Sequence, residues 1–227
     1  MKISEIFYSI QGEGMLAGVP SVFVRTSGCN LRCTWCDTPY TSWAPEGEEQ
    51  ALDAILSKVT GYGATHVVVT GGEPMIQENV VPLTQRLKDS GLHITIETAG
   101  TVYQPAVCDL MSISPKLANS IPEKREGGRW AMQHGRLRYQ PEVLKRLMAD
   151  YPYQLKFVIA APEDLEEVKT ILAQTEADHS RVILMPEGTD IEKLHERARW
   201  LSEICKTTRF RYGPRLHIDL YGNQRGV

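Results

Sequence analysis

The sequence lacks the features that would assign it to several large classes of protein. Its longest apolar runs have the length of strands, so we expect no segment that crosses a membrane. Its net charge is only −3 at pH 7 and its isoelectric point is about 6.1, so nucleic acid is not an expected partner. It has no low-complexity segment and no clear repeat. With 227 residues, 42% of them hydrophobic, we expect a single domain over residues 1–227 with a sizeable core.

The chain also lacks an even set of cysteines and a secretory signal at its N-terminus. Three of its five cysteines lie within eight residues, namely Cys29, Cys33 and Cys36, whereas Cys108 and Cys205 stand alone in apolar patterns. An odd count without a signal disfavours disulfides and predicts a cytoplasmic protein. Lone cysteines in apolar patterns usually behave as small buried hydrophobic residues.

No fourth cysteine lies near the trio. A ferredoxin-type [4Fe–4S] cluster takes four thiolates, and a structural zinc site closes with four nitrogen or sulfur ligands. Three local thiolates therefore predict a cluster with one iron open to another molecule. A distant cysteine, Cys108 or Cys205, is the alternative fourth ligand.

Strand-like and helix-like segments alternate along the chain. We expect strands at 21–26, 66–70, 93–98, 110–114, 154–160, 182–185 and 215–220, and helices at 52–59, 77–90, 141–150, 162–175 and 190–206. This alternation indicates parallel βαβ units with right-handed crossovers. About six such units are too few for an eight-fold barrel, so we expect an α/β fold, a partial (βα)6-type open barrel with a mostly parallel sheet.

Residues suited to chemistry follow the ends of the first four expected strands. They are the cysteine loop, the Thr70-Gly71-Gly72-Glu73 turn, Glu97, and the pair Ser114 and Lys116. Because the carboxyl ends of parallel strands meet at one edge, we expect these residues to form a single site.

The C-x3-C-x2-C spacing, followed by Gly-Gly-Glu-Pro after the next strand, resembles the radical S-adenosylmethionine (SAM) enzymes. This resemblance implies that SAM binds the open iron through its amino and carboxylate groups. It also implies that an electron from the reduced cluster cleaves SAM to a 5′-deoxyadenosyl radical. The SAM-binding residues it implies are Asp37, Gly71, Gly72, Glu73, Glu97, Ser114 and Lys116. The glycines would let backbone approach the methionyl end, and Glu73 would accept from its ammonium group. Glu97 either accepts from a ribose hydroxyl or caps its strand.

The N-terminal segments FYSIQGEG (7–14), GVPSVFVR (18–25) and CDT (36–38) resemble the family of 7-carboxy-7-deazaguanine synthases. That resemblance extends through the C-terminal LYGNQRGV. It implies a radical-mediated ring contraction of 6-carboxy-5,6,7,8-tetrahydropterin to 7-carboxy-7-deazaguanine with loss of ammonia. In this reaction, a step toward queuosine and related nucleosides, SAM is regenerated.

Substrate-binding residues follow from this resemblance and from their chemistry. Gln11, Gly12 and Glu13 offer amide, backbone and carboxylate groups to the edge of a pterin, and Arg25 is suited to a carboxylate. The resemblance implies Thr38 as a ligand of Mg²⁺, a metal that prefers hard oxygen donors. Thr70 either reaches the substrate or ends its strand, and His217 lies either beside the pterin or in a structural role.

Residues 120–138 are basic, with Lys124, Arg125, Arg129, Arg136 and Arg138 against two glutamates. One hypothesis is that this stretch docks an acidic flavodoxin or ferredoxin that reduces the cluster; the alternative is a solvated loop. The family resemblance also implies a homodimer.

Two other functions remain open at the level of sequence. An activase that generates a glycyl radical on a protein partner shares the cysteine spacing but has no use for a pterin-matching QGEG segment. A structural zinc or cluster module leaves GGEP, the Ser114–Lys116 segment and Thr38 unexplained.

Overall fold

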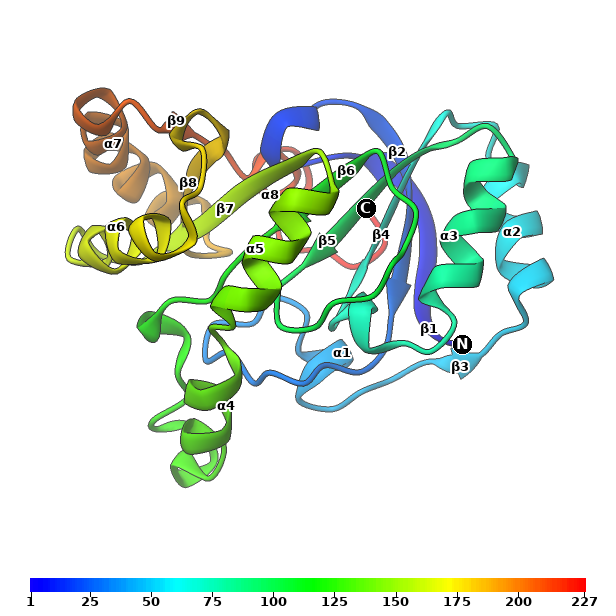
Figure 1. The fold of residues 1–227 in the computed structure, drawn as a ribbon, viewed down its shortest axis with the longest axis horizontal. Helices are drawn as coiled ribbons and strands as arrows, with labels where there is room; N and C mark the ends of the chain where they lie inside the picture. Colours follow the sequence, from blue (N-terminus) through cyan, green and yellow to red (C-terminus); the bar gives the residue numbers. More distant parts are fainter.

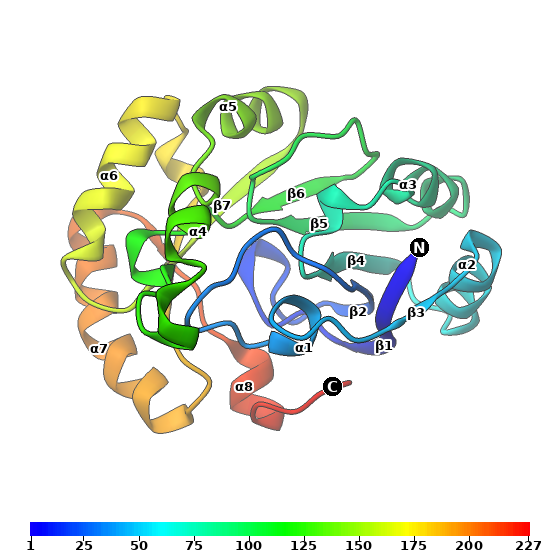
Figure 2. The same ribbon diagram turned by 90° about the horizontal axis from the view of Figure 1, so that it is seen from below.

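The computed structural model describes residues 1–227 as a curved nine-stranded sheet with helices around its outer face (Figures 1 and 2). The strands lie in the order β3-β1-β2-β4-β5-β6-β7-β8-β9. Their bounds are β1 (Lys2–Ile10), β2 (Pro20–Thr26), β3 (Glu48–Glu49), β4 (His66–Gly71), β5 (His93–Thr98), β6 (Leu110–Ile113), β7 (Tyr153–Ile159), β8 (Val182–Pro186) and β9 (Arg211–Tyr212).

Eight α-helices connect or follow these strands. They are α1 (Pro39–Ser42), α2 (Leu52–Gly61), α3 (Val80–Asp89), α4 (Ala131–Leu137), α5 (Pro141–Asp150), α6 (Asp164–Thr175), α7 (Ile191–Thr208) and α8 (Leu216–Tyr221). Short 3-10 helices occur at Gly14–Leu16, Pro74–Ile76, Ala118–Ser120, Arg125–Gly128 and His179–Arg181. None of the helices is long and apolar enough to cross a bilayer.

The sheet is parallel from β2 through β9, and only β1 pairs antiparallel with its two neighbours. Its edge strands β3 and β9 do not pair with each other, so the barrel is open. The predicted α/β fold with an open, mostly parallel sheet is therefore confirmed. The strand β1 and the two-residue edge strands were not predicted.

The two faces of the sheet differ in chemistry because side chains alternate along each strand. The outer face is apolar, and residues such as Val69, Ile96 and Phe157 belong to a 34-residue core beneath the helices. The inner face carries buried polar side chains, Thr95, Ser112, Gln154 and Lys156, beside a small apolar cluster that includes Phe7 and Phe23. A buried polar face requires partners, and those partners form the site described below.

The strand predicted at residues 215–220 is wrong, because these residues form helix α8. Leu216, Ile218 and Leu220 alternate as in a strand, but in so short a segment that pattern does not exclude a helix. β9 already occupies the available sheet edge beside β8, and the amides of Ile218 and Asp219 donate to the Arg215 carbonyl instead. The basic stretch at 120–138 is also more ordered than an irregular loop, since it contains α4.

Candidate active site

A cavity of about 470 Å³ opens at the carboxyl ends of the strands. The cysteine loop, the ends of β2 and β4 through β8, helix α8 and the C-terminal tail line it. All the predicted site residues but Glu73 lie in its wall. The expectation that these residues form a single site is therefore met by the fold, and their individual roles remain predictions.

The cysteine loop is held by the structure that follows it. The Gly28 amide donates to the Thr41 carbonyl at 2.8 Å, and the Trp43 indole donates to the Cys33 carbonyl at 3.0 Å. Cys36 Sγ lies 3.2 Å from Ser42 Oγ, and the Leu31 amide donates to Cys29 Sγ at 3.3 Å. Helix α1 and Trp43 thus hold the loop in place, and two of its sulfur atoms have hydrogen-bond partners.

Apolar side chains surround the three thiols. Leu31, Cys33 and Ala99 form a buried cluster against which Trp35 and Leu137 pack. Burial raises the pKa of Cys29 to about 12, helped by the nearby Glu73 carboxylate, and burial also raises the pKa values of Cys33 and Cys36. A thiol in such surroundings stays protonated unless a metal replaces the proton, which is how thiolate ligands form.

The three thiols do not form a group that could hold a single metal ion, with each other or with histidine or acidic side chains. A cluster needs no such convergence, because each thiolate binds a different iron. The other two cysteines pack against the main core, Cys205 within it and Cys108 at its edge, and neither lines the cavity. The structure thus provides three thiols at the cavity and no fourth.

The Gly71-Gly72 turn packs directly on the cysteine loop. A Cβ atom on Gly72 would lie 2.1 Å from the Gly28 carbonyl oxygen, which no side chain tolerates. The Glu73 amide donates to that same carbonyl at 2.9 Å. Gly72 is therefore required for backbone contact with the cysteine loop, in addition to any contact with a ligand.

Glu73 is fully buried and does not reach the cavity. Its carboxylate accepts from Thr98 Oγ1 at 2.7 Å, from the Ala99 amide at 2.8 Å and from the Met75 amide at 3.0 Å. Burial raises its pKa, and these bonds satisfy both of its oxygens. Glu73 thus links the turn after β4 to the end of β5, and its predicted contact with SAM stays a prediction.

Ser114 and Lys116 lie together beyond the end of β6. Lys116 Nζ donates to Ser114 Oγ at 2.8 Å and sits 5.7 Å from the centre of the Trp35 ring. Both residues line the cavity near the cysteine loop. A hydroxyl and an ammonium at this position are suited to a ribose and a carboxylate.

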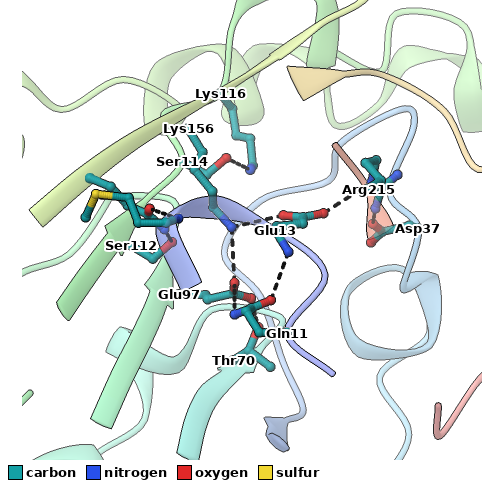
Figure 3. A network of polar contacts seen from close by, with 12 residues as sticks. Gln11, Glu13, Asp37, Thr70, Glu97, Ser112, Ser114, Lys116, Lys156 and Arg215 are labelled. Carbon is teal, nitrogen blue, oxygen red and sulfur yellow. Dashed lines mark hydrogen bonds and ion pairs between the residues drawn. The ribbon is translucent and has the colours of Figure 1, made fainter. Parts of the chain in front are cut away.

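A buried ammonium stands at the centre of the polar network on the inner face (Figure 3). Lys156 on β7 donates to Glu13 Oε2 at 2.9 Å and to Glu97 Oε1 at 3.1 Å, with only 3% of its side chain exposed. Burial by itself lowers the pKa of Lys156, but the two carboxylates outweigh it and raise that pKa. Glu97 also accepts from Thr70 Oγ1 at 2.9 Å and from Gln11 Nε2 at 3.3 Å.

Arg215 joins three segments that are far apart in the sequence. Its guanidinium bonds to Glu13 at 3.1 Å, to Asp37 in the cysteine loop, and to the Gly188 carbonyl after β8. Burial alone would raise the pKa of Glu13, but the charges of Lys156 and Arg215 outweigh it and lower that pKa. Glu13 is therefore an ionised carboxylate held between two cations.

His217 on α8 packs against the QGEG segment. A Cβ on Gly12 would lie 2.0 Å from His217 Nδ1, so only glycine permits this contact. Burial lowers the pKa of His217, although the Glu13 carboxylate opposes that effect. The imidazole is therefore neutral at pH 7 and can both donate and accept.

Arg25 lies at the rim with only part of its guanidinium engaged. Its Nε donates to Glu5 Oε1 at 2.7 Å, and the Tyr40 hydroxyl donates to the same oxygen at 2.8 Å. No hydrogen bond engages its two terminal nitrogens. Arg25 also lies 5.5 Å from the centre of the Phe7 ring, which stacks on Phe23 at 5.0 Å. The site thus combines a flat aromatic surface with a guanidinium group whose two terminal nitrogens are free to donate.

Thr38 is half-buried between the cysteine loop and α1. Its hydroxyl lies 3.9 Å from Cys36 Sγ and accepts from Thr41 Oγ1 at 3.4 Å. It lines the cavity, so its oxygen has lone pairs available to a ligand there.

Several lining residues were missed by sequence reasoning. Lys156 was visible as a lone charge within the apolar strand QLKFVI, and a lysine is seldom fully buried without a partner. Arg215 had no comparable signal, because its partners are 178 and 202 residues away. The sequence left the role of the tail open: Arg225 bonds to Glu46 at 2.9 Å and lies 4.1 Å from the Tyr40 ring, and Asn223, Gln224, Arg225 and Val227 line the cavity.

Comparisons with known proteins agree with this architecture. The model of the radical SAM superfamily matches residues 23–119. A 7-carboxy-7-deazaguanine synthase of Rhodopirellula baltica is 44% identical over 99% of this chain and 88% of its own length. One of Halobacterium salinarum is 44% identical over 98% of this chain and 91% of its own length. The crystal structure of QueE from Escherichia coli superposes with a TM-score of 0.69 and 26% identity, covering 93% of this chain and 92% of that one. The chain belongs to the family of 7-carboxy-7-deazaguanine synthases, a branch of the radical SAM enzymes.

Proposed function

We propose that the protein converts 6-carboxy-5,6,7,8-tetrahydropterin to 7-carboxy-7-deazaguanine with release of ammonia, as a step toward queuosine and related deazapurine nucleosides. The observation that carries the proposal is the meeting of two residue sets in one cavity. The cysteine trio lies on one wall, and the QGEG segment with its ionic network lies on another. Relatives 44% identical over nearly the whole chain carry the name of this activity.

Membership of the radical SAM superfamily implies a [4Fe–4S] cluster and SAM. The residues present fit both groups: three thiols face the cavity in apolar surroundings, and no other cysteine lines it. When bound, the cluster and SAM supply the electron and the 5′-deoxyadenosyl radical that abstracts a hydrogen atom from the substrate. Cys29, Cys33 and Cys36 would hold the cluster, and Gly71, Gly72, Ser114 and Lys116, which line the same cavity, are proposed to hold SAM.

The residues of the polar network are proposed to bind and orient the pterin. Glu13 is ionised and held by Lys156 and Arg215, so it can accept from the N–H edge of the ring at a fixed position. Gln11 and Thr70 are tied to Glu97 and present further polar groups to the same cavity. Phe7 and Phe23 give a planar ring an apolar contact surface.

Arg25 and His217, which line the same cavity, are also proposed to contact the substrate. The two free nitrogens of Arg25 match the two oxygens of the substrate carboxylate, while Glu5 holds its Nε. The neutral imidazole of His217 is suited to donate to a ring heteroatom or accept from one.

We further propose that Thr38 contributes a ligand to Mg²⁺. A hydroxyl at the cavity wall, with substrate oxygens and waters as the other ligands, matches the preference of Mg²⁺ for hard oxygen donors. The ion would orient the substrate carboxylate relative to the cluster loop.

The proposal extends to the setting of the reaction. The five cysteines are free thiols, consistent with a cytoplasmic enzyme of one domain whose cluster is reduced by a flavodoxin or ferredoxin. We also propose a homodimer, since exposed Tyr8, Tyr62 and Leu220 offer apolar surface that a second copy would cover. Light scattering of the reconstituted protein tests the dimer directly.

The deciding experiment is an anaerobic assay of the reconstituted protein with the carboxytetrahydropterin, SAM, Mg²⁺ and dithionite. We expect 7-carboxy-7-deazaguanine and an equal amount of ammonia, with less than stoichiometric use of SAM. Omission of Mg²⁺ and a Thr38→Ala variant test the metal. Cleavage of SAM without any deazaguanine product would contradict the proposal and favour an activase.

A further inference from the structure

The segment from Asn119 to His134 lies directly on the cysteine loop. The Thr34 amide donates to the Ser120 carbonyl at 2.8 Å, and the Arg32 amide donates to His134 Nδ1 at 3.0 Å. The Trp35 indole donates to the Asn119 carbonyl at 3.1 Å. Figure 2 shows the result: α4 lies beside the loop that follows β2.

Arginine and tryptophan side chains gather where these two segments meet. Arg125 stacks on Trp43 at 3.8 Å, while Arg32 and Arg129 each lie 5.0 Å from the Trp130 ring. These five residues are called the arginine–tryptophan patch below. Stacking of a guanidinium on an aromatic ring holds the charge in place at little further entropic cost.

The patch is positively charged although the chain is not. Only one of its three arginines has an acidic partner: Arg129 pairs with Glu126 at 2.8 Å, and Glu126 also accepts from the Trp130 indole. The chain as a whole carries −3. Near the patch, Met132 has 89% of its surface exposed, far more than any other large hydrophobic side chain. Arginine, tryptophan and methionine are the residue types enriched at protein–protein contacts.

A small cavity of about 60 Å³ connects the patch to the cysteine loop. Its lining includes Arg32 and Trp130 from the patch, His134 from α4, and the predicted cluster ligand Cys29. Arg32 also donates to the carbonyl of Cys29 at 2.7 Å. A partner seated on the patch would therefore approach Cys29 through this small cavity, without entering the active-site cavity.

We propose that the arginine–tryptophan patch is the docking surface for a small acidic electron-transfer protein that reduces the cluster. The inference rests on the proposed function, because it takes the three cysteines as ligands of a redox cluster. One electron passes from the partner's reduced flavin or iron–sulfur centre, which is oxidised, to the cluster, which is reduced. Charge complementarity identifies the partner: three guanidinium groups stacked on tryptophan rings, with an exposed methionine on the neighbouring helix α4, attract an acidic face that also has apolar surface.

Charge reversal at the two patch arginines that do not touch Cys29 tests the proposal. With Arg125→Glu/Arg129→Glu in the reconstituted enzyme, we expect the Kd for an acidic flavodoxin to rise at least about 10-fold at low salt. The rate of cluster reduction by flavodoxin hydroquinone should fall by a similar factor, and raising the salt should narrow the difference. Reduction by dithionite, followed by EPR, should be unchanged. The milder Arg125→Gln/Arg129→Gln variant should show a smaller effect in the same direction.

A matched control carries the same change of charge elsewhere. Lys58 on α2 and Lys193 on α7 are exposed and have no ion pair, so Lys58→Glu/Lys193→Glu should leave the Kd for flavodoxin within about twofold. Equal loss in patch and control variants, or no change in the patch variants, overturns the docking surface. These readouts require no deazaguanine product, so failure of the proposed reaction would be seen separately in the product assay.

Discussion

Removal of the Lys156 ammonium should leave two carboxylates facing each other in a buried space. Lys156 Nζ lies 2.9 Å from Glu13 and 3.1 Å from Glu97, and 3% of its side chain is exposed. Breaking a buried ion pair by removing one partner costs about 3–5 kcal/mol. Glu13 keeps its bond to Arg215, and Glu97 is 22% exposed, so we expect Lys156→Met to lower the free energy of unfolding by about 3 kcal/mol at pH 7.5.

The loss should depend on pH in a defined direction. The pKa of Glu13 in the folded protein lies below its ordinary 4.5, so its contribution to stability is present above about pH 4.5 and is lost as the pH falls through the folded pKa. Without Lys156, Arg215 remains as the main cation opposing the effect of burial on Glu13, so the pKa of Glu13 should rise, and its protonation relieves the repulsion with Glu97. The difference between wild type and variant should therefore be largest near pH 7.5 and smaller at pH 5.

Urea denaturation of the anaerobically reconstituted protein, followed by far-UV circular dichroism, measures both effects. Lys156→Met/Glu97→Gln should recover part of the loss, because it leaves one unpaired carboxylate instead of two. Lys145→Met is the matched control, since that ammonium is 45% exposed and lies 3.5 Å from Glu142; its cost should be below about 0.5 kcal/mol. A cost below about 1 kcal/mol for Lys156→Met, or one independent of pH, would refute the reasoning.

Three further predictions concern the cysteine loop, the QGEG segment and the two cysteines outside the cavity. Gly72→Ala places a Cβ against the backbone of the cysteine loop and should reduce the iron bound per chain, as measured by iron analysis. In the control Gly61→Ala no atom lies within 4 Å of the new Cβ, so the iron content should be unchanged. Gly12→Ala should displace the histidine of α8 and lower kcat/KM about 10-fold or more at unchanged iron content. Full activity of this variant would show that the histidine does not contact the substrate. Cys108→Ala and Cys205→Ala should keep both the iron and the EPR signal of the reduced cluster, and loss of iron in either variant would identify a fourth thiolate.

The order of strands and helices was largely predictable because segments with strand-like and helix-like hydrophobic patterns alternate along the chain. Strands β4, β5 and β7 were expected nearly where they occur, since buried parallel strands are short apolar runs. The segment at 215–220 was misassigned because three alternating apolar residues fit a strand and a short helix equally well. Whether this segment forms a strand or a helix depends on whether a sheet edge is free, and the local sequence does not contain that information.

The candidate site was predictable where its residues share a loop or follow successive strands. Cys29, Cys33 and Cys36 have that property, as do Thr70 and Glu97, which the parallel register brings to one edge. Glu73 belongs to the same motif, yet the fold turns it away from the cavity and satisfies it with backbone amides. The Gly-Gly-Glu-Pro motif thus predicted that this segment lies at the site, but it did not determine where each side chain points.

The sequence by itself determined the three local thiols, the glycine turn that follows the next strand, and the parallel arrangement that brings them together. These features depend on spacing within a few residues and on the direction of successive strands. Only the tertiary structure decided which charges are paired. Lys156 joins Glu13 to Glu97, and Arg215 joins Glu13 to the cysteine loop from about 200 residues away, near the far end of the chain. Such pairs form because a buried charge needs a partner at hydrogen-bond distance, and the curvature of the sheet determines which charges come within that distance.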